Sequence, residues 1–154
     1  MTADIEARLV KLGIVLPDAP APAANYVPFV QVGNIVYISG QVSMSNGELT
    51  KGKLGADLSV EQGAAAAKTC AIGLLAQVKA ACGGDLSKLV RAVKLTGFVN
   101  STADFGDQPA VINGASNFLV EVLGDAGRHS RSAVSAVSLP FGVAVEIEGI
   151  FQIA

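Results

Sequence analysis

The chain of 154 residues has few of the side chains that usually mark a metal centre, a disulfide framework or a nucleophilic catalytic site. It contains one histidine, His129, and two cysteines, Cys70 and Cys82. No Cys/His grouping has metal-ligand spacing, and the two cysteines fall too far apart along one predicted helix to form a disulfide. No nucleotide-binding loop or nucleophile elbow is present. We therefore expect reduced structural thiols, no metal and no cofactor.

Charged residues are also scarce, at 16% of the chain, and they give a net charge of −2. The 11 basic residues are scattered, whereas binding to a phosphate backbone usually requires a concentrated basic patch. Nucleic acid is therefore not expected as the main partner. The sequence has no uncharged apolar run of membrane-spanning length, so no membrane partner is expected. The start of the chain shows no secretory signal, which favours a cytoplasmic location.

Apolar residues, in contrast, make up 51% of the chain. This content fits either a well-filled core or an apolar surface that other subunits cover, and by itself it would allow a dimer as well as a larger assembly. The length indicates one domain, residues 1–154. Within it, residues 1–25 are expected to form a short N-terminal helix followed by a connector rich in Pro and Ala.

Turn and capping signals divide the remainder of the chain into strands and two long helices. Ser59 and Gln62 form a capping-box pattern, and Asp107 with Pro109 is typical of a helix start. The predicted order is two strands at 26–32 and 35–40, a helix from 60 to about 83, a strand at 89–99, a helix from 107 to about 124, and two strands around a turn at 139–142. This order predicts an α+β fold in which both helices cover one face of a mixed sheet.

The last two strands carry a specific set of motifs. Ser130-Arg131-Ser132-Ala133-Val134 is followed by Ser138-Leu139-Pro140 and then by Val145-Glu146-Ile147-Glu148. Upstream, Tyr26, Gly33-Asn34 and Ser39-Gly40-Gln41 stand in matching order. Over residues 20–154, these motifs resemble the RidA family, also called YjgF and historically the L-PSP endoribonucleases.

The resemblance implies a chorismate-mutase-like fold and a homotrimer whose sheets meet in a central barrel, with ligand clefts between neighbouring subunits. It also implies hydrolytic deamination of small imines or enamines derived from amino acids, releasing a keto acid and ammonia without a cofactor. Two alternatives stay open. One is a trimer that binds small carboxylate metabolites without turnover, and the other is the endoribonuclease or translation inhibitor of the older family name.

Two residues are the candidates for catalysis. By resemblance, Arg131 anchors the substrate carboxylate, because a guanidinium offers a planar fork of donors that matches it. Glu146 would position the attacking water or carry a proton to the leaving nitrogen. Glu148 shares its pleat face and is interpreted as structural. We expect Arg131 and Glu146 to converge on one cleft at a subunit boundary, and we interpret His129 as structural or loop-exposed.

Four further residues are the candidates for substrate binding. By resemblance, Tyr26 lines the cleft, Ser39 bonds ligand or water, Gly40 permits close approach of the backbone, and Asn113 faces the cleft from a helix. Three of them have a structural alternative: edge-strand packing for Tyr26, a bulge at Gly40 and a satisfied amide for Asn113. Departures such as Ala133, where many members have Cys, and the extra N-terminal helix indicate a divergent subgroup.

Overall fold

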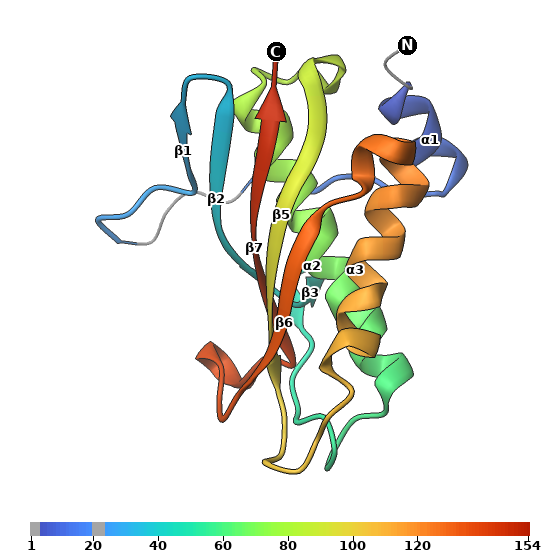
Figure 1. Ribbon diagram of the computed structural model, residues 1–154, viewed down its shortest axis with the longest axis vertical. Helices are drawn as coiled ribbons and strands as arrows, with labels where there is room; N and C mark the ends of the chain where they lie inside the picture. Colours follow the sequence, from blue (N-terminus) through green and yellow to red (C-terminus); the bar gives the residue numbers. More distant parts are fainter. Residues whose placement is uncertain (1–3, 20–23) are drawn as a thin grey trace.

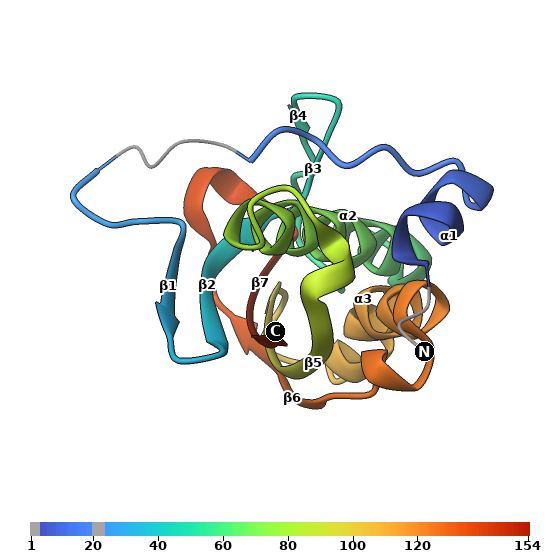
Figure 2. The same cartoon turned by 90° about the horizontal axis from the view of Figure 1, so that it is seen from above.

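The computed structural model describes residues 4–19 and 24–154, and in these residues a five-stranded sheet carries two long helices on one face (Figures 1 and 2). The helices and strands are α1 (Ile5–Lys11), β1 (Phe29–Val32), β2 (Ile35–Val42), β3 (Met44–Ser45), β4 (Glu48–Leu49), α2 (Val60–Ala81), β5 (Leu89–Asn100), α3 (Gln108–Leu123), β6 (Ser130–Ala136) and β7 (Val145–Ile153). Short 3-10 turns lie at η1 (Leu86–Lys88), η2 (Gly124–Gly127) and η3 (Pro140–Gly142). The predicted α+β class and both long helices are confirmed.

Helix α2 begins where the capping box predicts. The backbone N–H of Ser59 donates to Gln62 Oε1 at 2.8 Å, and the N–H of Gln62 donates to Ser59 Oγ at 3.2 Å. Small side chains such as Ala67, Cys70 and Ala71 lie on its buried face. Because they are short, α2 can approach both the sheet and α3 closely.

The closest approach between the two helices is at Gly114 on α3. A Cβ atom placed there would collide with the backbone carbonyl oxygen of Ala64 on α2. In an exposed helix, Gly→Ala stabilises by up to about 1 kcal/mol. Here the collision is with backbone, so we expect Gly114→Ala to lower the free energy of unfolding by about 1–3 kcal/mol. Urea unfolding measures this, with Gly106→Ala as control, since nothing lies within 4 Å of a Cβ at Gly106. A Gly114→Ala variant as stable as wild type would show that the helices can separate without cost.

The strand order is β1-β2-β7-β5-β6. The prediction of a terminal strand pair is therefore corrected, because β6 and β7 are not neighbours. Strand β6 pairs in parallel with β5, and β7 lies between β2 and β5, antiparallel to both. Helix α3 makes the crossover that a parallel pair requires. The side chains that β7 buries under the helices, including Val145, Ile147 and Phe151, suit this central position.

The first strand is shorter than predicted. Strand β1 begins at Phe29, and Tyr26 to Pro28 are outside it. Pro28 has no N–H to donate, but its carbonyl accepts from Ser39 N at 2.9 Å. The expected connector at 17–25 contains no helix or strand where it is described, and residues 20–23 lie outside the described part.

The expected N-terminal helix is present as α1 and is joined to both long helices. Arg8 Nη1 donates to the carbonyl of Val122 on α3 at 3.2 Å, and Glu6 pairs with Lys79 on α2 at 3.0 Å. Ile5 and Leu9 are buried in the core. Figure 2 shows α1 beside α3, on the helical side of the sheet.

The other face of the sheet carries exposed apolar side chains. Tyr37 on β2 is 48% exposed, Val134 on β6 is 44% exposed and Val30 on β1 is 51% exposed. Because successive side chains in a strand point to opposite faces of the sheet, each of these three points away from the helices while its neighbours in the strand point toward them. None of the helices in the described residues is long and apolar enough to cross a membrane.

Candidate functional site

Glu146 lies on the open face of the sheet, over a depression of about 360 Å³. Its neighbours Val145 and Ile147 are buried under the helices, so strand alternation turns its carboxylate the other way. Residues of the depression come from three strands and the segment before β1: Tyr26, Ser39, Gly40, Phe98, Glu146 and Glu148. The structure therefore brings four predicted site residues together with Glu148.

A β-bulge shapes this depression. The pairing of β2 with β7 shifts between Ile38 and Gln41, so Ser39 and Gly40 together stand opposite Glu148. A Cβ atom on Gly40 would lie 2.5 Å from Glu146 Oε1 and 3.0 Å from its Cδ. The glycine thus leaves room for the carboxylate to lie against the backbone. The bulge interpretation of Gly40 is confirmed, and its role in substrate binding stays a prediction.

We expect Gly40→Ala to displace the Glu146 carboxylate while leaving the fold intact, because the colliding atoms are the far end of a flexible side chain. Activity assigned to Glu146 should fall about 10-fold or more, since small misplacements of a reacting group are costly. Steady-state kinetics together with urea unfolding measure both effects. In a Glu146→Ala background, Gly40→Ala should have no further effect on rate. An additional loss there would mean that Gly40 acts by another route.

The electrostatic setting of Glu146 favours its protonated form. Half-burial, with Val42 and Phe98 as its cross-strand neighbours, raises the pKa of the Glu146 carboxyl, and the nearby charge of Glu148 raises it further. Neither ion pair among the described residues involves Glu146. A raised pKa makes the Glu146 carboxylate a better proton acceptor than an ordinary glutamate, which suits a general base.

Ser39 ties the segment before β1 to the bulge. Its hydroxyl donates to the carbonyl of Val27 at 2.8 Å, next to Tyr26. The hydroxyl hydrogen is therefore already used, and Ser39 can offer only a lone pair to a ligand or water. Tyr26 is 58% exposed and lines the depression, so edge-strand packing does not describe it.

Beyond Ser39 the depression continues into a cavity of about 400 Å³ between β2 and α2. Its walls include Ile72, Gly73 and Gln77 of α2 and Phe141 of the turn before β7. Gln77 is buried, and its Oε1 has no hydrogen-bond partner among the described residues. The volume suits a small organic molecule, and the walls are mainly apolar.

Arg131 lies in a second depression, of about 310 Å³, between β6 and α3. Its Nη1 donates to Ser116 Oγ at 3.0 Å and its Nη2 donates to the carbonyl of Pro109 at 3.2 Å. Asn113 lines the same depression and is exposed. Asn113 and Arg131 thus line one depression, apart from Tyr26 and Glu146, and the role of Asn113 in substrate binding stays a prediction.

The guanidinium of Arg131 has no acidic partner among residues 4–19 and 24–154. Of its five N–H groups, two hydrogen-bond to protein acceptors in the described part of the chain. The remaining donors are suited to a carboxylate, which a guanidinium can hold through two parallel bonds. Within the described ranges, no cluster of three or more His, Cys, Asp and Glu is placed to hold a metal ion.

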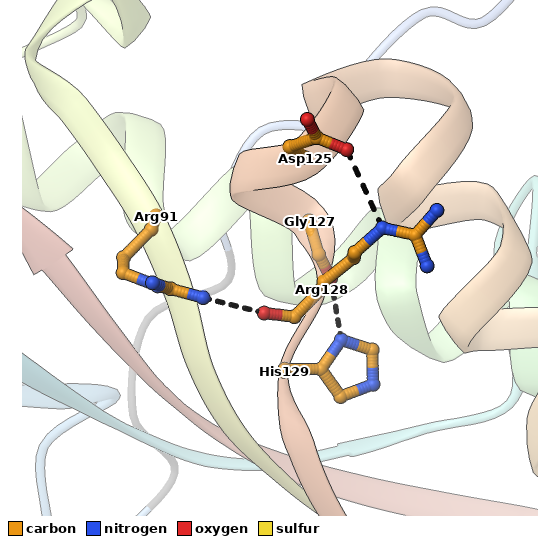
Figure 3. Close-up of polar contacts among 5 residues, drawn as sticks. All are labelled: Arg91, Asp125, Gly127, Arg128 and His129. Carbon is orange, nitrogen blue, oxygen red and sulfur yellow. Dashed lines mark hydrogen bonds and ion pairs between the residues drawn. The ribbon is translucent and has the colours of Figure 1, made fainter.

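His129 is half-buried beside Arg131, not loop-exposed. Its Nδ1 lies 2.6 Å from the carbonyl oxygen of Gly127, as Figure 3 shows, and its Nε2 lies 2.9 Å from Ser116 Oγ. Burial lowers the pKa of His129, and the charge of Arg131 lowers it as well. Arg91 Nη2 donates to the carbonyl of Arg128 at 2.6 Å, and the Arg128 side chain pairs with Asp125. Figure 3 draws both contacts.

Within one chain, Arg131 and Glu146 do not meet. Arg131 reaches toward α3, on the helical face, whereas Glu146 lies on the open face. Strand β5 also separates their backbones, since it lies between β6, which carries Arg131, and β7, which carries Glu146. The site residues thus form two groups: Tyr26, Ser39, Gly40 and Glu146 in one, and Asn113 and Arg131 in the other.

Comparison with known proteins shows which family has this architecture. Residues 6–147 match the family described as "YjgF/chorismate_mutase-like, putative endoribonuclease". The chain belongs to this family. A crystal structure of an Agrobacterium tumefaciens protein of unknown function superposes with a TM-score of 0.91 at 51% identity, over 97% of this chain and 92% of that one.

Two curated relatives extend the comparison. The chain is 45% identical to "Protein TCP17" of Trypanosoma cruzi, over 97% of this chain and 94% of the relative. It is 31% identical to a "2-iminobutanoate/2-iminopropanoate deaminase" of Dermatophagoides farinae, over 89% and 92% of the two chains. The RidA resemblance of the motifs is thus confirmed by similarity along most of the chain.

For this YjgF/RidA chain, sequence reasoning missed Ser116, which bonds both Arg131 and His129. A serine in the middle of an apolar helix gives no sequence signal of such a role. Its position three residues after Asn113 puts both on one helix face, which is the only available hint.

Proposed function

We propose that the protein hydrolyses small imino or enamino acids to keto acids and ammonia. The observation that carries the proposal is Glu146: a half-buried carboxyl with a raised pKa, placed beside the Ser39 lone pair over a ligand-sized depression. Membership of a family with relatives named imino acid deaminases supports the reaction type.

In the proposed reaction, water adds to the carbon of a protonated C=N bond. The Glu146 carboxylate accepts a proton from this water as the C–O bond forms, and Ser39 Oγ accepts the water's second hydrogen bond. Glu146 then delivers the proton to the nitrogen. As the C–N bond breaks, the Glu146 carboxylate takes the proton of the new hydroxyl group, so a keto acid forms and ammonia leaves, carrying this proton away as ammonium. Such imines hydrolyse spontaneously, so positioning and electrostatic stabilisation supply enough acceleration without a strong nucleophile.

We further propose that the site is completed between subunits. The Arg131 group and the Glu146 group lie on different faces of one chain, and the open sheet face carries exposed apolar side chains that a neighbour would cover. A ring of three copies would bring the Arg131 of one protomer to the Glu146 depression of the next through a repeated, heterologous interface. Arg131 would then hold the substrate carboxylate over Glu146.

The direct test is ammonia release from an imino acid generated in the assay by an amino acid oxidase. Purified protein should accelerate release above the spontaneous rate, in proportion to its concentration. Heat-denatured protein is the control for nonspecific catalysis. Release that proceeds at the spontaneous rate at every protein concentration would contradict the proposal.

One observation favours a second candidate, which is carboxylate binding without turnover. The Arg131 depression is complete within a single chain, whereas the proposed turnover needs groups from two. Calorimetry with small keto acids distinguishes the two functions. Binding that is lost in Arg131→Ala, without any acceleration of imine hydrolysis by wild type, would establish the binding function.

A further inference from the structure

The hydrogen bonds around Arg131 continue through Ser116 to His129 and end on the backbone. Arg131 Nη1 is 3.0 Å from Ser116 Oγ, Ser116 Oγ is 2.9 Å from His129 Nε2, and His129 Nδ1 is 2.6 Å from the Gly127 carbonyl oxygen. The three side chains come from β6, α3 and the residue that precedes β6. This series of hydrogen bonds therefore links the guanidinium of Arg131 to helix α3 and to the segment that precedes β6.

The direction of every hydrogen in this network follows from which groups can donate. A carbonyl only accepts, so His129 Nδ1 carries the proton, and Nε2 of the neutral ring is an acceptor. A guanidinium only donates, so Ser116 Oγ accepts from Arg131. The single hydroxyl hydrogen of Ser116 is then left for His129 Nε2, and each group has a partner.

Two further observations show that the network holds the guanidinium in place. Arg131 Nη2 donates to the carbonyl of Pro109 in the first turn of α3, so the fork is held at two points on one helix. Gly127 is buried and packs closely on α3, because a Cβ there would collide with the backbone carbonyl oxygen of Leu119. This packing fixes the Gly127 carbonyl, which accepts the hydrogen bond from His129 Nδ1.

We propose that Ser116 and His129 are positioning residues that orient Arg131 for a carboxylate ligand. This inference rests on the proposed function for the identity of the ligand, but not for the network itself. A preorganised guanidinium binds more tightly because less side-chain freedom is lost on binding. Neither residue is expected to touch the reacting carbon.

The charges around His129 make it a reporter of what Arg131 binds. Arg131 on β6, Arg128 and Asp125 at η2, and Arg91 on β5 are the charged groups nearby, while α3 contributes uncharged side chains to this depression. A carboxylate on Arg131 would offset the charge that lowers the pKa of His129. Pyruvate should therefore raise the pKa of His129.

The test combines nitrogen NMR of the imidazole with pyruvate titrations of the full chain. His129 is the only histidine, so its ring signals need no assignment by mutation. We expect the Nδ1–H tautomer in the free protein and a rise in the pKa of His129 when pyruvate is added. Ser116→Ala should raise the Kd for pyruvate about 10-fold, the usual effect of losing a hydrogen bond to a charged group.

Matched variants separate positioning from a general structural effect. Ser116→Thr keeps the hydroxyl and should stay within about 3-fold of the wild-type Kd, since the same hydrogen bond can form. Ser130→Ala removes a neighbouring serine that bonds only the Val93 carbonyl, and it should bind pyruvate as wild type does. His129→Phe should weaken binding as Ser116→Ala does.

Equal pyruvate affinity in wild type and Ser116→Ala overturns the inference, as does an Nε2–H tautomer or a wild-type protein that binds no pyruvate. These outcomes are independent of turnover. Intact pyruvate binding with the expected variant effects, but no imine hydrolysis, contradicts the proposed reaction and supports the positioning network.

Discussion

Glu146→Gln is expected to lower the rate of imine hydrolysis by about 10²- to 10⁴-fold, the usual contribution of a general acid–base. The amide keeps the size and polarity of the side chain but can neither accept the proton of the attacking water nor pass it to nitrogen. Measuring kcat by ammonia release gives the effect. The control is Glu121→Gln, an exposed carboxylate on α3 that lines neither depression, which should change the rate less than about 3-fold because a distant surface charge is weakly coupled to the site.

Although Glu146→Gln should lower the rate, it should raise the stability of the folded chain at high pH. Because the pKa of Glu146 is raised in the folded chain, folding favours the protonated form. The stabilisation of the fold by protonated Glu146 is fully present below its ordinary pKa of 4.5, and it is lost as the pH rises through the raised pKa of the folded chain. Glu146→Gln should therefore unfold at higher urea concentration than wild type at about pH 8, with little difference near pH 4.

A Glu146→Gln variant with normal kcat would remove Glu146 from the mechanism. A variant that is less stable than wild type at high pH would instead show that the ionised carboxylate has a favourable partner in the assembled protein. The two measurements thus separate the chemical role of Glu146 from its cost to the fold.

Arg131→Ala is expected to lower kcat/KM for an imino acid by about 10²-fold, because two hydrogen bonds to a charged carboxylate are lost. Arg131→Lys should recover only part of this, since an ammonium cannot form the two parallel bonds of a guanidinium. Ammonia-release kinetics at several substrate concentrations give the values.

The control for Arg131 is Arg128→Ala. Arg128 lies three residues away, its side chain is exposed, and its ion pair with Asp125 at 3.4 Å is also exposed, so little effect on rate is expected. If Arg128→Ala and Arg131→Ala lower kcat/KM equally, the role of Arg131 is general electrostatics and not carboxylate recognition.

Local signals in the sequence predicted the helices and the pleat face of the site acid. Ser59 and Gln62 marked the start of α2, and alternation along β7 placed Glu146 and Glu148 together, away from Ile147 and Phe151. These features depend on residues close together in the chain. They could therefore be predicted without knowledge of the fold.

The features that sequence reasoning missed depend on contacts between distant residues. The position of β7 is set by pairing with β2, which lies more than a hundred residues earlier in the chain, and with β5. The turn signals at 139–142 look the same as those of a hairpin. Ser116 is fifteen positions from Arg131 and thirteen from His129, and only the packing of α3 against β6 brings them together. The aromatic and β-branched residues Tyr26 and Val27 favour a strand, but Pro28 has no N–H for the ladder, so β1 begins only at Phe29.

The central claim is that Arg131 of one protomer and Glu146 of its neighbour share one active site. Co-expression of differently tagged Arg131→Ala and Glu146→Gln chains tests it, because each variant alone is nearly inactive. In a ring of three, every hybrid of either composition has one site in three, roughly, that joins an intact Arg131 to an intact Glu146. We predict recovery of about a third of wild-type activity in purified hybrids, with native mass spectrometry confirming their composition. Hybrids that form and remain as inactive as the parent variants would contradict the shared site.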